Sequence, residues 1–124
     1  MSVNCTWSVN DMTHKDADGG VILVYWSCVA ASVPAAEDDK IFTATDGGKL
    51  VMTYDASAPG FIPYGSLTEI DVLGWVYADL AANSDVENET PEQARARVEN
   101  ERVAKVWAQI ERANSQSTGL PWEA

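Results

Sequence analysis

The sequence predicts an α+β fold, with an antiparallel sheet of about four strands followed by two helices and an extended C-terminal tail. Three observations lead to this prediction. Apolar and polar residues alternate in the first half, two helix-start signals with apolar stripes follow in the second half, and 124 residues suffice for one domain. We therefore expect a single domain over residues 1–114, strand-rich in 1–55 and helical in 66–114, and a tail over 115–124.

The first two predicted strands form a hairpin. Apolar residues alternate with polar ones from Val3 to Val9, which is typical of a half-buried strand. The segment Asp16–Gly20 has turn chemistry, and the nearly continuous apolar run Val21–Val33 fits a central strand covered on both faces. This hairpin would bring Cys5 close to residues 28–30. Free buried thiols are the usual state in a reducing compartment, and a disulfide between the two cysteines is the alternative.

Two shorter predicted strands complete the sheet. The segments Lys40–Thr45 and Lys49–Tyr54 flank Asp46-Gly47-Gly48, which we interpret as a second hairpin turn. A loop with two prolines and a glycine follows over residues 55–63.

The first predicted helix starts at Ser66-Leu67-Thr68-Glu69, which matches a capping box, and runs to about Ala82. Its apolar stripe consists of Ile70, Leu73, Tyr77 and Leu80. This stripe is widened by Val72, Trp75 and Val76. The widened face exceeds what one sheet face needs, so we expect a second partner there, either the next helix or another subunit.

The second predicted helix starts at Thr90-Pro91-Glu92-Gln93 and runs to about Asn114. Little in its first half can be buried, so we expect that half to be solvated. It carries the i,i+4 charge pairs Arg95–Glu99, Arg97–Glu101 and Glu101–Lys105. The second half should pack through a stripe of Val103, Val106, Trp107 and Ile110.

The net charge of −11 argues against nonspecific binding to nucleic acid or to anionic membranes. Acids exceed bases in both halves of the chain, so the charge is not concentrated in one. The N-terminus lacks the basic and apolar regions of a signal peptide, and the longest apolar run is far shorter than the ~20 residues of a membrane span. We therefore expect synthesis in the cytoplasm without a membrane anchor.

The sequence offers no catalytic residues, metal ligands or cofactor motif that we would assign. His14, the one histidine, lies before a turn and is expected to be an exposed residue at a strand end. Asp16-x-Asp18-Gly19-Gly20 has the opening of a calcium loop but lacks its later ligands, so a hairpin turn is favoured. We predict that the protein is not an enzyme and binds no cofactor.

The tail supplies the best candidates for a protein interface. Leu120, Pro121 and Trp122 place two large apolar side chains at the end of the chain, and Trp75 adds a third on the widened helix face. Proline keeps such a tail extended, and tryptophan is a preferred interface anchor. Two outcomes remain open: the tail folds back on its own domain, or it docks on a neighbouring chain.

Several segments together resemble one protein family. They are Cys5-Thr6-Trp7, Asp18-Gly19-Gly20 before a strand with Trp26, Phe61–Glu69, Val72–Val76 and Leu120-Pro121-Trp122. The pattern resembles short proteins encoded by tailed phages of marine bacteria, cyanobacterial phages among them. It departs from them in three places: Ser115–Gly119 stands where they have a proline-rich stretch, residues 83–97 lengthen the second helix, and two residues follow Trp122. The resemblance implies a phage setting and no particular activity.

With the phage setting that the resemblance implies, we predict a small structural or accessory protein of a tailed-phage virion, either a head decoration protein or a tail or neck component. The expected partners are other virion proteins of the capsid or tail and further copies of the chain, with no nucleic acid and no membrane. The expected location is the virion, after synthesis in the host cytoplasm. Two alternatives remain open: a phage assembly factor such as a tail-fibre or capsid chaperone, and an acidic host-directed inhibitor.

Overall fold

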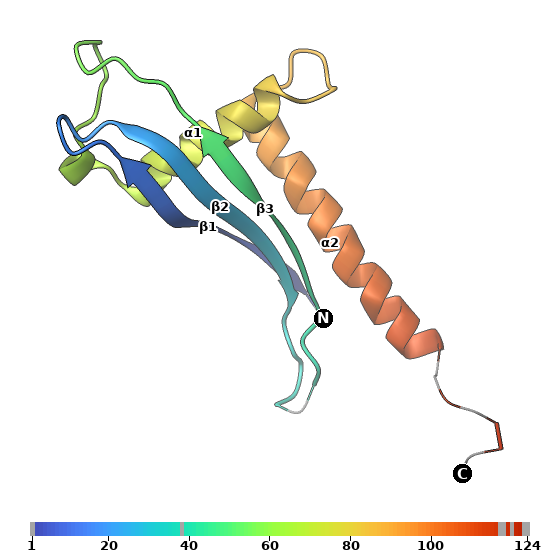
Figure 1. The fold of residues 1–124 in the computed structure, drawn as a ribbon. Helices are drawn as coiled ribbons and strands as arrows, with labels where there is room; N and C mark the ends of the chain where they lie inside the picture. Colours follow the sequence, from blue (N-terminus) through green and yellow to red (C-terminus); the bar gives the residue numbers. More distant parts are fainter. Residues whose placement is uncertain (1, 38, 117–118, 120, 123–124) are drawn as a thin grey trace.

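The structure is a computed structural model that describes residues 2–37, 39–116, 119 and 121–122. Its elements are β1 (Val3–His14), β2 (Val21–Ser32), β3 (Thr43–Val51), a short 3-10 helix (Tyr64–Ser66), α1 (Glu69–Ala82) and α2 (Pro91–Ser115). The α+β prediction is confirmed: an antiparallel sheet of order β1-β2-β3 is followed by two helices (Figure 1). The central strand is β2, and β1 and β3 form the edges.

The described part of the sheet has three strands and not four, because the predicted second hairpin turn is wrong. Asp46, Gly47 and Gly48 lie within β3 and pair with Cys28, Ser27 and Trp26 of β2. A Cβ at Gly48 would lie 3.3 Å from the Trp26 ring, and one at Gly47 would lie 3.0 Å from the Trp26 carbonyl oxygen. These glycines make room for a bulky neighbour on the adjacent strand, and neither has positive φ.

The predicted first hairpin is confirmed. Its turn is closed by two hydrogen bonds, from the Lys15 N–H to the Gly20 carbonyl and from the Gly19 N–H to the Lys15 carbonyl. Gly19 has a φ of +74°, which favours glycine. The register pairs Cys5 with Ala30, as expected, and both cysteines are free thiols. Burial is the main cause that raises the pKa of Cys28 to about 12, so this thiol stays protonated.

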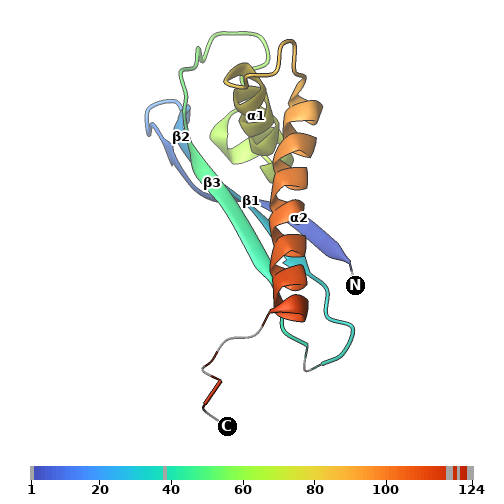
Figure 2. The ribbon, with the colours of Figure 1, turned by 90° about the vertical axis from the view of Figure 1, so that its right-hand side faces the viewer.

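Both helices cover the same face of the sheet (Figure 2). Alternate residues of β2 from Val24 to Ala30 are buried beneath them, whereas Tyr25 on the other face is 42 % exposed. The prediction that β2 is covered on both faces is therefore wrong. Its apolar character reflects one buried face and one half-exposed face of a three-stranded sheet.

The core consists of two apolar clusters under the helices. The larger joins Trp7 and Trp26, whose rings stack with centroids 5.6 Å apart, to Val72 and Val76 of α1 and Val98 of α2. The smaller cluster joins Ala30 of β2 to Val106 and Ile110 of α2. Because α2 contributes to both clusters, it ties the two ends of the sheet together.

Helix α1 starts two residues later than the predicted capping box. Thr68 is the N-cap, and its side chain forms the capping box with Asp71. The stripe prediction is partly wrong as well, since Ile70 is 83 % exposed while Val72 is among the core residues. Val72 and Val76 are one helical turn apart and face the sheet and α2 together.

The predicted start of α2 is confirmed by a capping box between Thr90 and Gln93. Two other predictions for this helix are wrong. Its first half is not simply solvated, because Ala94 and Val98 are buried, and Trp107 is 43 % exposed where packing was expected. The small side chains of Ala94 and Val98 allow the start of α2 to pack closely in the core. The spacing of large apolar residues along the helix does not predict this close packing.

The surface ion pairs of α2 follow the predicted spacing in two of three cases. Arg95–Glu99 and Arg97–Glu101 are formed, at 3.3 and 3.9 Å. Glu101 additionally pairs with Arg102 at 3.8 Å, and no pair with Lys105 occurs among the described residues. Arg97 also forms a two-pronged pair with Glu89 at 3.0 and 3.1 Å, which fastens the loop between the helices to α2.

Candidate functional site

The candidate site is a groove along the outer edge of β1, which we call the β1–α1 groove. Its volume is about 480 Å³. The start of β1 forms one wall, α1 forms the other, and the first turns of α2 contribute a charged end. The lining residues are Cys5, Thr6 and Trp7 from β1, Ile70, Leu73 and Tyr77 from α1, and Arg95 from α2.

Part of the β1 backbone is uncovered at this groove. The N–H of Val9 faces away from β2 and donates to the Glu69 carboxylate of α1 at 3.2 Å. Alternate residues of an antiparallel strand face the same way, so the N–H groups of Cys5 and Trp7 also face the edge. No hydrogen bond of the described residues covers these two groups. An uncovered strand edge is a template for pairing with another chain.

Apolar and aromatic side chains line the groove. Trp7 packs edge-to-face against Tyr77, with ring centroids 4.9 Å apart, and Leu73 is buried. Ile70 is 83 % exposed, although burying an isoleucine stabilises by roughly 1.5–3 kcal/mol. The first turn of α1 holds Ile70 beyond the edge of the sheet, where its own domain does not cover it. This arrangement favours an apolar partner.

Arg95 supplies the cationic group of the groove. Its guanidinium lies 5.3 Å from the Tyr77 ring centroid and pairs with Glu99 at 3.3 Å. Burial raises the pKa of Tyr77, and burial followed by the charge of Glu99 raises the pKa of Cys5. The phenol and the thiol are therefore neutral near pH 7. The groove can accept an apolar group next to an acid, and it lacks an activated nucleophile.

The tail residues predicted as interface candidates lie away from this groove. Pro121 and Trp122 both follow α2 in the chain and lie in a turn, with Pro121 exposed and Trp122 77 % exposed. Of the two outcomes left open for Trp122, the structure does not have it folded back on its own domain. Leu120 lies outside the described residues.

Residues 2–122 match the family described as "Domain of unknown function (DUF7936)". The chain belongs to this family. No curated protein and no solved structure matches the chain. The family description assigns no activity, so a function for this DUF7936 domain has to be argued from its own residues.

Trp75, the remaining interface candidate, lies apart from the β1–α1 groove. It is half-buried, packs against the larger core cluster and lines an apolar cavity of about 260 Å³ under the loop 55–62. The residues opposite it include Met52, Tyr54 and Phe61. Part of the widened helix face therefore serves to pack this loop. The sequence identified the face as having a second partner but did not identify the loop as that partner.

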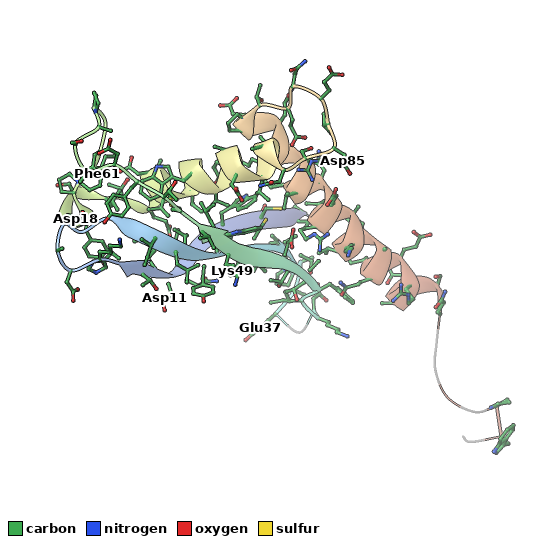
Figure 3. The ribbon with its side chains drawn as sticks, turned by 45° about the horizontal axis from the view of Figure 1, so that its top comes forward. Asp11, Asp18, Glu37, Lys49, Phe61 and Asp85 are labelled. Carbon is green, nitrogen blue, oxygen red and sulfur yellow. The ribbon has the colours of Figure 1, made fainter. Side chains whose placement is uncertain are left out.

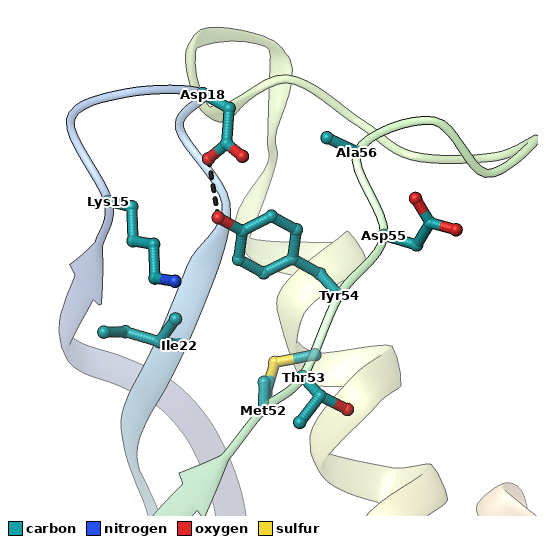
Figure 4. Close-up of a pocket in the computed structure, with 8 residues that line it drawn as sticks. All are labelled: Lys15, Asp18, Ile22, Met52, Thr53, Tyr54, Asp55 and Ala56. Atoms are coloured by element: carbon teal, nitrogen blue, oxygen red, sulfur yellow. Dashed lines mark hydrogen bonds between the residues drawn. The ribbon is translucent and has the colours of Figure 1, made fainter.

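A polar hollow of about 410 Å³ separates the β1–β2 turn from the segment after β3 (Figure 4). Here the Tyr54 hydroxyl donates to the Asp18 carboxylate at 2.6 Å, and Asp18 also accepts from the Gly20 N–H. The bond between the side chains lowers the pKa of Asp18 and raises the pKa of Tyr54. The contact fastens the turn to the chain after β3. The sequence indicated the turn but gave no sign of Tyr54, which is distant along the chain.

His14 is at a strand end as predicted, but it is not exposed. Its ring stacks on Tyr64, with centroids 3.7 Å apart, and is half-buried. The Nδ1 atom of His14 is buried and has no hydrogen-bond partner among residues 2–37 and 39–116. A structural role in packing the 3-10 turn against the hairpin follows from the stacking contact.

The acidic side chains project from separate parts of the surface. Asp11 lies on β1, Glu37 in the loop after β2 and Asp85 in the loop between the helices (Figure 3). In the described part of the chain, no group of three or more His, Cys, Asp or Glu residues is arranged to hold a metal ion. Likewise, no helix within that part is long and apolar enough to cross a membrane.

Proposed function

We propose that this protein is a small structural or accessory protein of a tailed-phage virion, a head decoration protein or a tail or neck component, and that it acts by protein–protein docking. Its proposed partners are capsid or tail proteins and further copies of itself. The phage setting is taken from the sequence resemblance described above. The docking role is argued from the structure.

One observation carries the docking role: the β1–α1 groove combines an uncovered strand edge with the 83 % exposed side chain of Ile70. Exposure of these groups to water is unfavourable. Binding of a partner that supplies backbone hydrogen bonds and an apolar side chain is therefore favourable. The exposed Trp122 adds a second apolar group of the kind that anchors interfaces.

Three titratable groups with shifted pKa values help to hold the fold that forms the groove. The pKa of Asp18 is lowered by its bond to Tyr54, and that of Glu89 by its pair with Arg97. Burial raises the pKa of Cys28. Each of these three shifts has a structural cause, which is a hydrogen bond, an ion pair or burial.

The acid excess of 19 Asp and Glu over 8 Lys and Arg fits a protein on the surface of a particle. Such a surface remains soluble and repels nucleic acid. The wide distribution of the acids favours this role over that of an inhibitor that mimics nucleic acid, which needs its acids on one face.

Mass spectrometry of gradient-purified particles of the encoding phage tests the proposal. Copies of this protein would be counted against the major capsid protein. Copy numbers of the same order as the capsid protein would support a head or tail-tube position, and a handful of copies per particle would support a neck or baseplate position. If the protein is present in infected cells but missing from particles, the structural role is wrong and an assembly factor takes its place.

A further inference from the structure

We propose that the tail around Trp122 of one copy docks in the β1–α1 groove of a second copy. This inference rests on the docking role proposed above and names the partner. The groove would bind an extended segment in which an apolar side chain, Trp122, is followed by an acid, Glu123.

Each half of the contact carries a large apolar side chain that its own domain leaves exposed. Ile70 of the groove is 83 % exposed and Trp122 of the tail is 77 % exposed. They are the two most exposed large apolar side chains in the described part of the chain. A tryptophan buries roughly 150–250 Å² when it packs fully, and a groove of about 480 Å³ has room for one indole with its neighbours.

The backbone of β1 also favours an extended partner. The outward N–H groups of Cys5 and Trp7 need an extended partner strand. The structure has Pro121 and Trp122 in a turn, so docking requires this turn to open. Pro121 favours the open, extended form, because it keeps the residue before it out of the helical region. In such a tail the backbone of Trp122 faces β1 while Pro121, which has no N–H to donate, faces away. A proline is tolerated at that position of an edge strand.

The tail and the groove carry opposite charges. Glu123 follows Trp122 in the sequence, and Arg95 lies at the charged end of the groove. Two copies with a net charge of −11 each repel one another, so the contact needs a local attraction. About half of the Arg95 side chain is exposed, so it can pair with an incoming carboxylate in addition to Glu99.

The length of the tail favours a tail from another copy. Along α2, Arg95 and Gln116 are about 32 Å apart at a rise of about 1.5 Å per residue. From Gln116 to Trp122 the chain can span only about 22 Å when fully extended. The backbone of Trp122 therefore cannot lie beside Arg95 of its own chain, even if the tail reverses direction directly after the helix.

The contact joins different surfaces of two copies, because one gives its tail and the other its groove. Each copy still has an unused groove or tail after the first contact. Such head-to-tail contacts close into rings or grow into filaments. This is the kind of assembly that a repeated position on a phage particle requires.

The test is sedimentation velocity of the full chain over a concentration series. The wild-type protein should shift from monomer to dimer and larger species as its concentration rises. We expect Trp122→Ala to weaken association by at least about 30-fold, the effect of a hot-spot residue. Trp107→Ala is the matched control, because Trp107 is an exposed tryptophan outside the groove and should leave association unchanged.

The groove is tested with a second pair of variants. Ile70→Glu should weaken association to a similar degree, whereas Val51→Glu, at a 70 % exposed residue on β3, should not. Arg95→Glu and Glu123→Arg should each weaken association, and their combination should restore it. Circular dichroism and thermal unfolding would show that each variant remains folded.

A mixing experiment distinguishes this contact from other modes of association. Ile70→Glu retains its tail and Trp122→Ala retains its groove, so an equimolar mixture should form a dimer that grows no further. The proposal is overturned if the wild type remains a monomer, if Trp122→Ala associates like the wild type, or if the mixture remains monomeric. The presence of the protein in particles is measured separately, so a chain that remains a monomer in solution but is found in virions overturns this inference and leaves the proposed function standing.

Discussion

Gly20 and Gly74 are two residues at which the same substitution should have opposite effects on stability. A Cβ at Gly20 would lie 1.9 Å from the Tyr54 ring, whereas nothing lies within 4 Å of a Cβ at Gly74 in α1. We expect Gly20→Ala to lower the free energy of unfolding by about 1–3 kcal/mol through overpacking. Gly74→Ala should raise it by about 0.5–1 kcal/mol, because alanine favours the helix. Urea denaturation measures both. Equal stability of Gly20→Ala and the wild type would contradict the packing of Tyr54 over the hairpin turn.

The hydrogen bond between Tyr54 and Asp18 should make stability depend on pH. It lowers the pKa of Asp18 from the ordinary value of 3.8, so its contribution is present above that value and is lost as the pH falls through the lowered pKa. It also raises the pKa of Tyr54 from 10.0, so the contribution is lost again as the pH rises through the raised pKa.

We therefore expect Tyr54→Phe to lower the melting temperature near neutral pH and to have progressively less effect in strong acid and strong base. The measurement is thermal unfolding of both proteins across a pH series. Asp18→Asn is the control, since it keeps an acceptor for the hydroxyl but removes the carboxylate that titrates. A destabilisation by Tyr54→Phe that is the same at every pH would show that the hydrogen bond is not its cause.

At the scale of the elements, α2 buries small residues and exposes a large one. Val98 is 2 % exposed and Trp107 is 43 % exposed. Val98→Ala should lower the free energy of unfolding by about 2 kcal/mol, through the loss of two buried carbon groups and the cavity left behind. Trp107→Ala should cost less than about 1 kcal/mol although it removes more atoms. Urea denaturation measures both losses. A larger loss for Trp107→Ala than for Val98→Ala would mean that α2 packs through the stripe that the sequence predicted.

The elements that were predicted correctly are those whose sequence patterns depend only on neighbouring residues. Alternation predicted β1, and the Thr90 capping box predicted the start of α2, because both depend on neighbouring residues alone. Gly47 and Gly48 were misread because their reason is Trp26 on the adjacent strand. Ile70 was misplaced for a related reason, since the buried face of α1 is set by where the sheet and α2 lie. The spacing of residues within one helix or strand does not show which other elements pack against it.

At the scale of the whole molecule, the candidate site could be predicted only in part. The sequence identified Trp122 as an interface candidate, and the structure has it exposed. It could not identify the β1–α1 groove, because that groove is formed by residues of β1, α1 and α2 that are far apart in the chain. The free edge of β1 follows from the strand order, which alternation does not specify.

The reactivity of the two cysteines reports how often the core opens to solvent. Cys28 is fully buried in the larger core cluster, between the sheet and the helices, and burial raises its pKa to about 12. Labelling needs a thiolate in contact with the reagent, so Cys28 should react only when the core opens. The Cys5→Ser variant leaves Cys28 as the one thiol.

We expect the Cys28 thiol of Cys5→Ser to react with a disulfide reagent at pH 8 at least about 10³-fold more slowly than in the unfolded chain, since native domains favour the folded state by such factors. Urea below the unfolding transition should speed the reaction in proportion to the population of the open state. The measurement is the absorbance of the released reagent over time, with Cys28→Ser reporting Cys5 alone. Reaction of Cys28 at the unfolded-chain rate in native buffer would mean that α1 and α2 do not seal the sheet face as the structure has them.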